Sequence, residues 1–182
     1  MATYASLRYD HDGSAITNTL TTATPAFSVA NENDGDYTFS RNSWHLLTQE
    51  TEYYDVQSCF NNTGSPVTLN SLTAPAYSFT PNVAGWYYIG TYSSGDAQSF
   101  EQLEDCYWAI YKNGSAEIVG GNDLLNASDQ QDAGMIAGII QLNGTGDYVQ
   151  SYIQVGDTSS HGVSINYNGS YRKNSFFGYR VS

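Results

Sequence analysis

Oxygen-bearing side chains gather beside a glycine at two places in the sequence, DHDG at residues 10–13 and NENDGD at residues 31–36. Clustered carboxylate and amide oxygens in a turn are the ligands that Ca²⁺ prefers. Neither run fits the twelve-residue calcium loop with its final Glu, so solvated turns are the alternative interpretation. Ca²⁺ is the one cofactor that the sequence suggests. The candidate metal ligands are, in order, Asp34 and Asp36, then Asp10 and Asp12.

Groups that could perform catalysis are few. The carboxylate pairs Glu50/Glu52 and Glu104/Asp105 have the chemistry of a glycosidase, but any acidic chain contains such pairs. Neither a Gly-x-Ser-x-Gly elbow nor a Gly-x-x-x-x-Gly-Lys phosphate loop is present in the sequence. His45, in SWHLL, is interpreted as a structural residue. The sequence therefore predicts a protein that is not an enzyme.

The two cysteines, Cys59 and Cys106, match no metal-binding spacing. We interpret them as buried free thiols. A disulfide formed after release from the cell is the alternative.

The composition limits the partners. The chain of 182 residues has a net charge of −12 and contains 16 Tyr, but only 6 Lys and Arg together. An acidic surface repels phosphate, so nucleic acid is not expected as a partner. No run approaches about 18 apolar residues, so membrane insertion is not expected. The start, MATYASLRYDHDGSAITNTL, has neither the basic nor the apolar region of a secretory signal, which predicts synthesis in a cytoplasm.

Two regions of different composition divide the chain. Residues 1–24 are rich in Thr and weakly apolar, and we expect an N-terminal arm there. Residues 25–182 consist of short β-like runs separated by turn residues, the pattern of an all-β sandwich or barrel. The last residues, SFFGYRVS, are apolar although chain ends usually fray. They predict a final strand held in the middle of a sheet.

Two hairpins are predicted in the second half of the chain. Asn113-Gly114 tolerates the positive φ of a tight turn between Tyr111 and Ile118. A second hairpin joins Met135–Leu142 to Tyr148–Val155 through residues 143–147. Five Asn-x-Ser/Thr sequons are interpreted as turn residues rather than glycosylation sites: Asn61, Asn113, Asn126, Asn143 and Asn168.

Three segments in the same order resemble the complement C1q-like family, whose fold resembles that of the tumour necrosis factor family. The matching residues are Phe79, Thr80, Pro81, Gly85, Tyr87, Tyr88 and Ile89, then Leu142, Gly146, Asp147 and Val149, and finally Phe176, Phe177, Gly178, Tyr179, Arg180 and Val181. Phe177 replaces a small Ser of the family, and the insert at residues 93–106 is long. The family's collagen-like stalk is absent from this sequence.

The resemblance implies a ten-stranded jelly-roll sandwich that forms a homotrimer, with the last strand in the inner sheet near the three-fold axis. The residue pattern agrees. A two-sheet sandwich buries one face of each sheet, whereas GWYYIG and SFFGY are apolar on both faces, so a second subunit would cover the other. The expected core or trimer contacts are Phe27, Phe79, Gly85, Trp86, Tyr87, Tyr88, Tyr148, Phe176, Gly178 and Tyr179.

Aromatic residues in and after the insert, Phe100, Tyr107 and Trp108, are candidates for surface recognition. Tyrosine-rich surfaces stack on sugar rings and also suit protein interfaces. The favoured alternative is that these residues are core or trimer contacts.

The function that these features suggest is a virion surface protein of a bacteriophage: a trimeric knob, fibre tip or head decoration. It would be made in the host cytoplasm and joined to capsid or tail proteins by the N-terminal arm. A host glycan or a host protein would be its external partner. The alternatives are a bacterial surface or spore-coat adhesion module, then a cytokine-like or complement-like animal ligand, and last a glycan-active enzyme.

Overall fold

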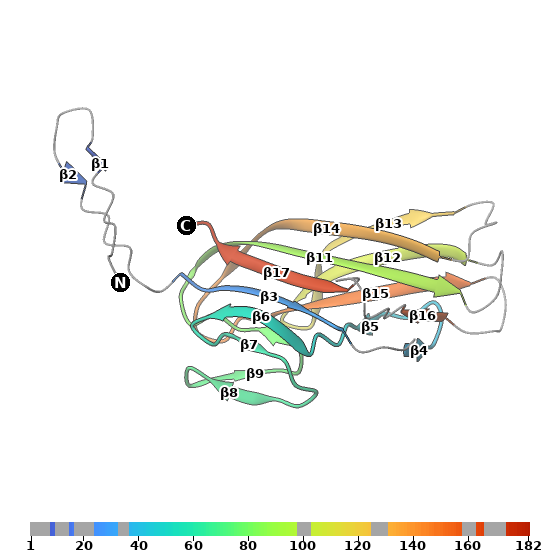
Figure 1. Ribbon diagram of the computed structural model, residues 1–182, viewed down its shortest axis with the longest axis horizontal. Coiled ribbons are helices and arrows are strands. Elements are labelled where there is room, and N and C mark those ends of the chain that lie inside the picture. The colour runs from blue at the N-terminus through green and yellow to red at the C-terminus, as the bar shows by residue number, and fades with distance from the viewer. Residues whose placement is uncertain are drawn as a thin grey trace.

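The computed structural model describes residues 8–9, 15–16, 24–32, 37–97, 103–124, 131–157, 163–165 and 174–182. All regular secondary structure in these ranges is β-strand, arranged mainly in two sheets that lie one over the other along the long axis of the molecule (Figure 1). Among the described residues there is no helix that could cross a lipid bilayer.

The first sheet contains the two longest strands and the chain end. Its order is β4-β16-β11-β17-β3-β6, in which β16 and β17 pair with different parts of β11. β14 pairs along almost the whole length of β11. The bounds are β3 Ala26–Ala30, β4 Tyr37–Phe39, β6 Thr51–Val56, β11 Gly85–Ala97, β14 Gln131–Leu142, β16 Val163–Ile165 and β17 Ser175–Arg180.

The second sheet has the order β13-β12-β15-β10-β7, with β5 also paired to β15. Two small hairpins, β1–β2 and β8–β9, complete the described strands. The bounds are β5 His45–Leu46, β7 Phe60–Asn61, β10 Ser78–Phe79, β12 Leu103–Lys112, β13 Ser115–Asp123 and β15 Val149–Asp157, and in the hairpins β1 Arg8–Tyr9, β2 Ala15–Ile16, β8 Val67–Leu69 and β9 Leu72–Ala74.

Two five-stranded paths form the body of the sandwich: β6-β3-β17-β11-β14 and β7-β10-β15-β12-β13. All of their pairings are antiparallel. This arrangement confirms the predicted ten-stranded jelly roll. The described residues of the insert, 93–97 and 103–106, belong to it, because β11 continues to Ala97 and β12 begins at Leu103.

The last strand, β17, lies between β11 and β3, as its apolar sequence predicts. Phe176 pairs with Thr91 on one side and with Val29 on the other. The chain end is held as well, because the Trp86 N–H donates to the Ser182 carbonyl and the Val181 N–H donates to the Trp86 carbonyl.

One hydrophobic cluster fills the half of the sandwich nearer the chain end. Phe27 stacks on Phe79 with ring centroids 4.3 Å apart, and Phe176 meets Phe27 edge-on at 4.9 Å. These three side chains and that of Tyr87 are fully buried, which confirms them as core residues. Gly178 is needed beside them, because a Cβ there would lie 2.5 Å from Ile89 Cδ1.

A second hydrophobic cluster, around Trp108 and Ile153, fills the other half. Between the two clusters the inward positions of β11 and β15 are polar: Thr91, Ser93 and Ser151 are all fully buried. These hydroxyl groups lie between the two clusters, and Ile136 packs against both clusters.

The second predicted hairpin is wrong, because β14 pairs with β11 in the first sheet whereas β15 pairs with β12 in the second, so residues 143–147 connect the two sheets. The first predicted hairpin is present. Asn113 and Gly114 have φ of 51° and 80°, and β12 pairs with β13 across this turn. Cys59 and Cys106 are free and buried, which confirms the prediction for both. Among the described residues of the N-terminal arm, β1 pairs with β2. The boundary at residue 24 stays a prediction.

Candidate interaction surface

The outward side of the first sheet is apolar across all five strands of its main path. Directly opposed residues of antiparallel strands project from the same side of a sheet, so the register gives rows of neighbours. One row consists of Tyr54, Ser28, Phe177, Gly90 and Ala137, and the next of Val56, Ala26, Tyr179, Tyr88 and Ile139.

Most of the exposed large apolar side chains of the described chain lie on this side. We call them, together with the half-buried Tyr88, the outer apolar face: Tyr54, Val56, Trp86, Tyr88, Met135, Ile139 and Tyr179. Met135 and Ile139 are 61% and 59% exposed, and Tyr54 and Tyr179 are each 48% exposed. Contiguous apolar surface of this kind marks a contact with another molecule.

The sequence predicted part of this face. Trp86, Tyr88 and Tyr179 lie on it, and the rings of Tyr88 and Tyr179 are 5.6 Å apart. Gly85 lies at its edge, where a Cβ would collide with the Ser182 carbonyl and the Arg180 guanidinium. The contributions of β6 and β14 were not predicted. The alternation of Tyr54 and Val56 with the polar Asp55 was a sequence signal for the contribution of β6.

Tyr148 was expected among the core or trimer contacts, and it is not a core residue. It lies just before β15, half-buried, where its N–H donates to Asn113 Oδ1 over 3.0 Å. It approaches the turn between β12 and β13, because a Cβ on Gly114 would lie 3.6 Å from its hydroxyl oxygen. The residue therefore packs against a turn at the end of the second sheet.

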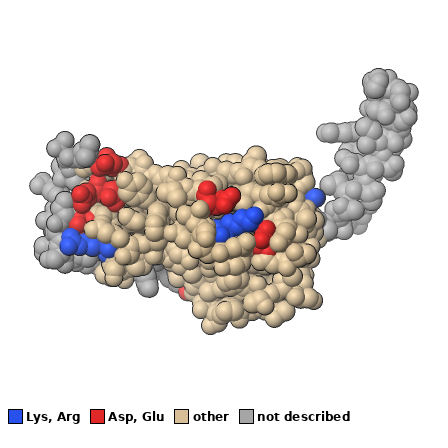
Figure 2. Space-filling view, turned by 180° about the vertical axis from the view of Figure 1, so that it is seen from behind, with Lys and Arg blue, Asp and Glu red and all other residues tan. Residues whose placement is uncertain are grey.

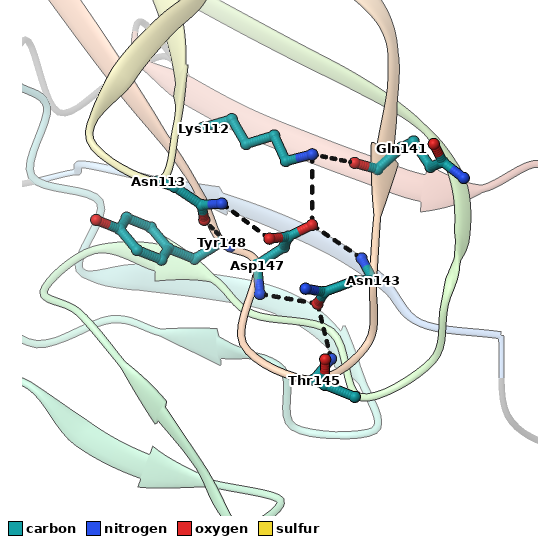
Figure 3. Close-up of polar contacts among 7 residues, drawn as sticks. All are labelled: Lys112, Asn113, Gln141, Asn143, Thr145, Asp147 and Tyr148. Atoms are coloured by element: carbon teal, nitrogen blue, oxygen red, sulfur yellow. Dashed lines mark hydrogen bonds and ion pairs between the residues drawn. The ribbon is translucent and has the colours of Figure 1, made fainter.

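Asp147 holds two loops together at this end of the sandwich (Figure 3). Its carboxylate accepts hydrogen bonds from Asn113 Nδ2 at 2.8 Å and from the Asn143 N–H at 3.0 Å. Lys112 Nζ lies 3.3 Å from the same carboxylate and donates to the Gln141 carbonyl at 2.7 Å. Asn143 Oδ1 in turn accepts from the N–H groups of Thr145 and Asp147.

The electrostatics of Asp147 follow from these contacts. Partial burial would raise the pKa of its carboxyl, but the hydrogen bonds from Asn113 and Asn143 and the Lys112 ammonium outweigh burial and hold the pKa below its ordinary value. The ionised carboxylate is therefore part of the fold. Asn113 and Asn143 are turn residues, as the sequence predicted.

The candidate recognition residues do not form one patch. For Trp108 the surface role is wrong, and the favoured alternative, a core contact, is confirmed. It is only 2% exposed, and its Nε1–H donates to the Ser93 carbonyl at 3.1 Å. The neighbouring Tyr107 is half-buried, and because side chains alternate along a strand it projects from the outward side of the second sheet. Phe100 lies outside the described residues.

The calcium candidates Asp10, Asp12, Asp34 and Asp36 also lie outside the described residues. Within the part of the chain that the structure describes, no group of three His, Cys, Asp or Glu side chains could hold a metal ion. His45 is structural, since its ring packs on Phe39 and its Nε2 bonds the Ser40 carbonyl at 2.8 Å.

Sequence reasoning missed a group of aromatic residues on the outward side of the second sheet. Tyr111 stacks on Tyr152 with ring centroids 4.1 Å apart, and Trp44 meets Tyr111 edge-on at 6.0 Å. All three side chains are half-buried. The alternation of Tyr107, Ala109 and Tyr111 in β12 was a signal for one member, but Trp44 and Tyr152 come from distant segments.

Charged side chains are unevenly distributed over the molecule. Figure 2 shows the side away from the viewer in Figure 1: Asp and Glu gather at one end, a small group of opposite charges lies nearer the middle, and most of the remaining surface carries no charge. Desolvation, followed by the charges of Glu104 and Asp123, raises the pKa of Asp105.

Comparison with known proteins supports the fold. No family model matches the chain, and no curated protein matches it in sequence. Among solved structures, the globular domain of zebrafish complement 1qA protein matches with a TM-score of 0.54 and 17% identity, over 87% of this chain and 98% of that one.

Two further solved structures are similar. Murine APRIL matches with a TM-score of 0.55 and 9% identity over 87% of this chain and 99% of the other. The Eiger TNF structure from S. frugiperda matches with a TM-score of 0.52 and 14% identity over 88% of this chain and 94% of the other. At these identities the likeness shows a C1q/TNF-like jelly-roll fold.

Proposed function

We propose that this protein is a non-enzymatic binding module that works as a homotrimer, with the outer apolar face as the contact between subunits. The observation that carries the proposal is the exposure of Met135, Ile139, Tyr54 and Tyr179 on one sheet. A sandwich needs only the inward side of each sheet for its core. The outward side of the second sheet is not built in the same way, because Val119 is its one large apolar side chain in the described chain that is exposed.

Three copies fit this face better than two. The exposed apolar residues extend from one edge strand, β6, to the other, β14. A face that reaches both edges can contact different surfaces of two neighbours, and such head-to-tail contacts close into a ring under cyclic symmetry. The trimer is also what the resemblance to the C1q-like family implies.

Native mass spectrometry of the intact chain tests the proposal. We expect a species that contains three copies of the 19.9 kDa chain at micromolar concentration. A dimer would be compatible with a subunit contact through the outer apolar face but would exclude three-fold symmetry. A single-chain species across the concentration range would exclude the subunit contact altogether.

We further propose that the trimer is displayed on the surface of a bacteriophage particle and joined to it by residues 1–24. The support is compositional: a Thr-rich segment precedes the jelly roll, and the chain is acidic with only 6 Lys and Arg. A bacterial surface or spore-coat adhesion module is the alternative. Labelled electron microscopy of intact particles separates the two, because label on the capsid or tail supports the first and label on cells alone supports the second.

Deletion of residues 1–24 tests the attachment. The shortened chain should stay folded and keep its subunit number, yet fail to join the particle. If the deletion unfolded the protein, the N-terminal residues would belong to the sandwich and the attachment role would be wrong.

A further inference from the structure

Aromatic residues gather on the outward side of the second sheet, and we call them the aromatic ledge: Trp44, Tyr111 and Tyr152, which are in ring contact, and Tyr148, whose charge would act on Tyr152. Strand pairing builds it, because β15 lies between β12 and β5, with Tyr152 opposite Ala109 on one side and Leu46 on the other. Tyr111 lies one pair further along β12, opposite Gln150. The ring of Tyr111 covers that of Tyr152 at 4.1 Å, and Trp44 borders Tyr111.

The polar tips of the ledge have no partner among the described residues. Within the described part of the chain, the hydroxyls of Tyr111, Tyr148 and Tyr152 and the indole N–H of Trp44 make no hydrogen bond. Tyr87, in the core, contrasts with them, because its hydroxyl donates to the Val83 carbonyl at 2.6 Å. The ledge thus presents flat apolar rings edged by four unpaired donors.

The phenols of Tyr111 and Tyr152 keep their protons at neutral pH. Burial raises the pKa of Tyr111, and burial followed by the neighbouring Tyr111 and Tyr148 raises the pKa of Tyr152. Both phenols are therefore neutral hydrogen-bond donors at neutral pH.

The charge around the ledge excludes an anionic ligand. The nearest cation along β12, Lys112, is already engaged by Asp147 and the Gln141 carbonyl. Arg41 donates to the Asp157 carbonyl, and the chain as a whole carries a net charge of −12. A phosphorylated, sulfated or sialylated ligand would be repelled and would find no cation in this part of the described surface to pair with it.

We propose that the aromatic ledge binds the pyranose rings of a neutral oligosaccharide. One side of such a ring is apolar and stacks on an aromatic ring, while its hydroxyl oxygens accept hydrogen bonds from phenol and indole donors. The proposal rests on the proposed function, of which it names the ligand. It uses the sheet opposite to the outer apolar face, so a trimer would carry three ledges and bind a multivalent glycan surface with avidity.

The test is binding of the full-length protein to an array of immobilised neutral oligosaccharides that end in glucose, galactose, mannose, fucose or N-acetylglucosamine, with sialylated and sulfated members included. The strongest neutral binder is then titrated in solution by calorimetry. We expect Tyr111→Ala and Trp44→Ala each to weaken its binding by about tenfold or more. The matched control is Val119→Ala, an exposed position on the neighbouring strand β13, and it should bind as the wild type does.

Light scattering on every variant separates the outcomes. A variant that keeps its subunit number but loses oligosaccharide binding supports the ledge as the binding site. The proposal is overturned if no neutral oligosaccharide is retained, if anionic members are preferred, or if the two variants bind as the wild type does. A change of subunit number in Tyr111→Ala or Trp44→Ala would identify the ledge as a contact between copies. Glycan binding by a single-chain species would overturn the proposed trimer and leave the ledge intact.

Discussion

Thr91 and Ser151 meet across the middle of the sandwich, with their hydroxyl oxygens 2.5 Å apart. Thr91 belongs to β11 in the first sheet and Ser151 to β15 in the second, and both are fully buried. Thr91 Oγ1 also donates to the Ser175 carbonyl at 3.2 Å, so a single hydroxyl links both sheets and the last strand. This contact lies between the two hydrophobic clusters and joins the two sheets.

Thr91→Val should lower the free energy of unfolding by about 1–3 kcal/mol, because it leaves the Ser151 hydroxyl buried without its partner. Chemical denaturation at fixed chain concentration measures the loss. The double variant Thr91→Val/Ser151→Ala should recover part of it, since both polar groups are then gone. Losses that simply add in the double variant would show that the two hydroxyls are not coupled.

Phe176→Ala should cost about 3–5 kcal/mol, the range found for truncation of a buried Phe. The side chain is completely buried, since it packs against Phe27 and Phe60 in the core. Thermal unfolding measures the effect, and Val181→Ala, at an exposed position of the same chain end, is the control. Equal melting temperatures for the two variants would mean that β17 is misplaced.

Asp147→Asn should destabilise the protein at neutral pH and have a smaller effect in acid. The folded-state pKa of Asp147 is lowered, so its contribution to stability is present above its unfolded pKa of about 4 and is lost as pH falls through the lowered value. The difference in melting temperature between variant and wild type should therefore shrink below about pH 4. Glu117→Gln, at an exposed carboxylate on β13, is the control. A difference that stays constant between pH 7 and pH 3 would contradict this role.

The sequence predicted the elements that local chemistry determines. Asn113-Gly114 forms its turn because Gly tolerates positive φ, and the apolar end at Phe176 and Phe177 lies between two strands because only a paired strand can bury it. The position of Trp108 could not be predicted in the same way. β12 is aromatic on both sides, so alternation alone does not say whether Tyr107 or Trp108 faces the core.

Strand pairing between distant segments explains why two surface groups were not predicted from the sequence. Trp44 and Tyr152 share a surface only because β5 pairs with β15, and neither segment carries a local signal of that pairing. The outer apolar face likewise depends on the register of β14 against β11, which places Ile139 beside Tyr88. Such contacts follow from topology rather than from composition.

Calcium should raise the melting temperature, because the acidic sequences at residues 10–13 and 31–36 carry the oxygen ligands that it prefers. A ligand that binds only the folded state adds about 2.7 kcal/mol at a hundredfold excess over Kd. Sodium chloride at matched ionic strength is the control, because screening alone relieves repulsion in an acidic protein. Asp34→Asn/Asp36→Asn should abolish the calcium effect, and equal shifts with both salts would exclude a specific site.

Sedimentation equilibrium of two matched variants determines whether the outer apolar face joins subunits. Ile139→Asp places a charge at a position that is 59% exposed on this face, and Val119→Asp does the same at a position that is 53% exposed on the second sheet. We expect the wild type and Val119→Asp to sediment as three chains and Ile139→Asp to dissociate into folded single chains. A wild type of one chain, or an Ile139→Asp variant that keeps three, would contradict the account.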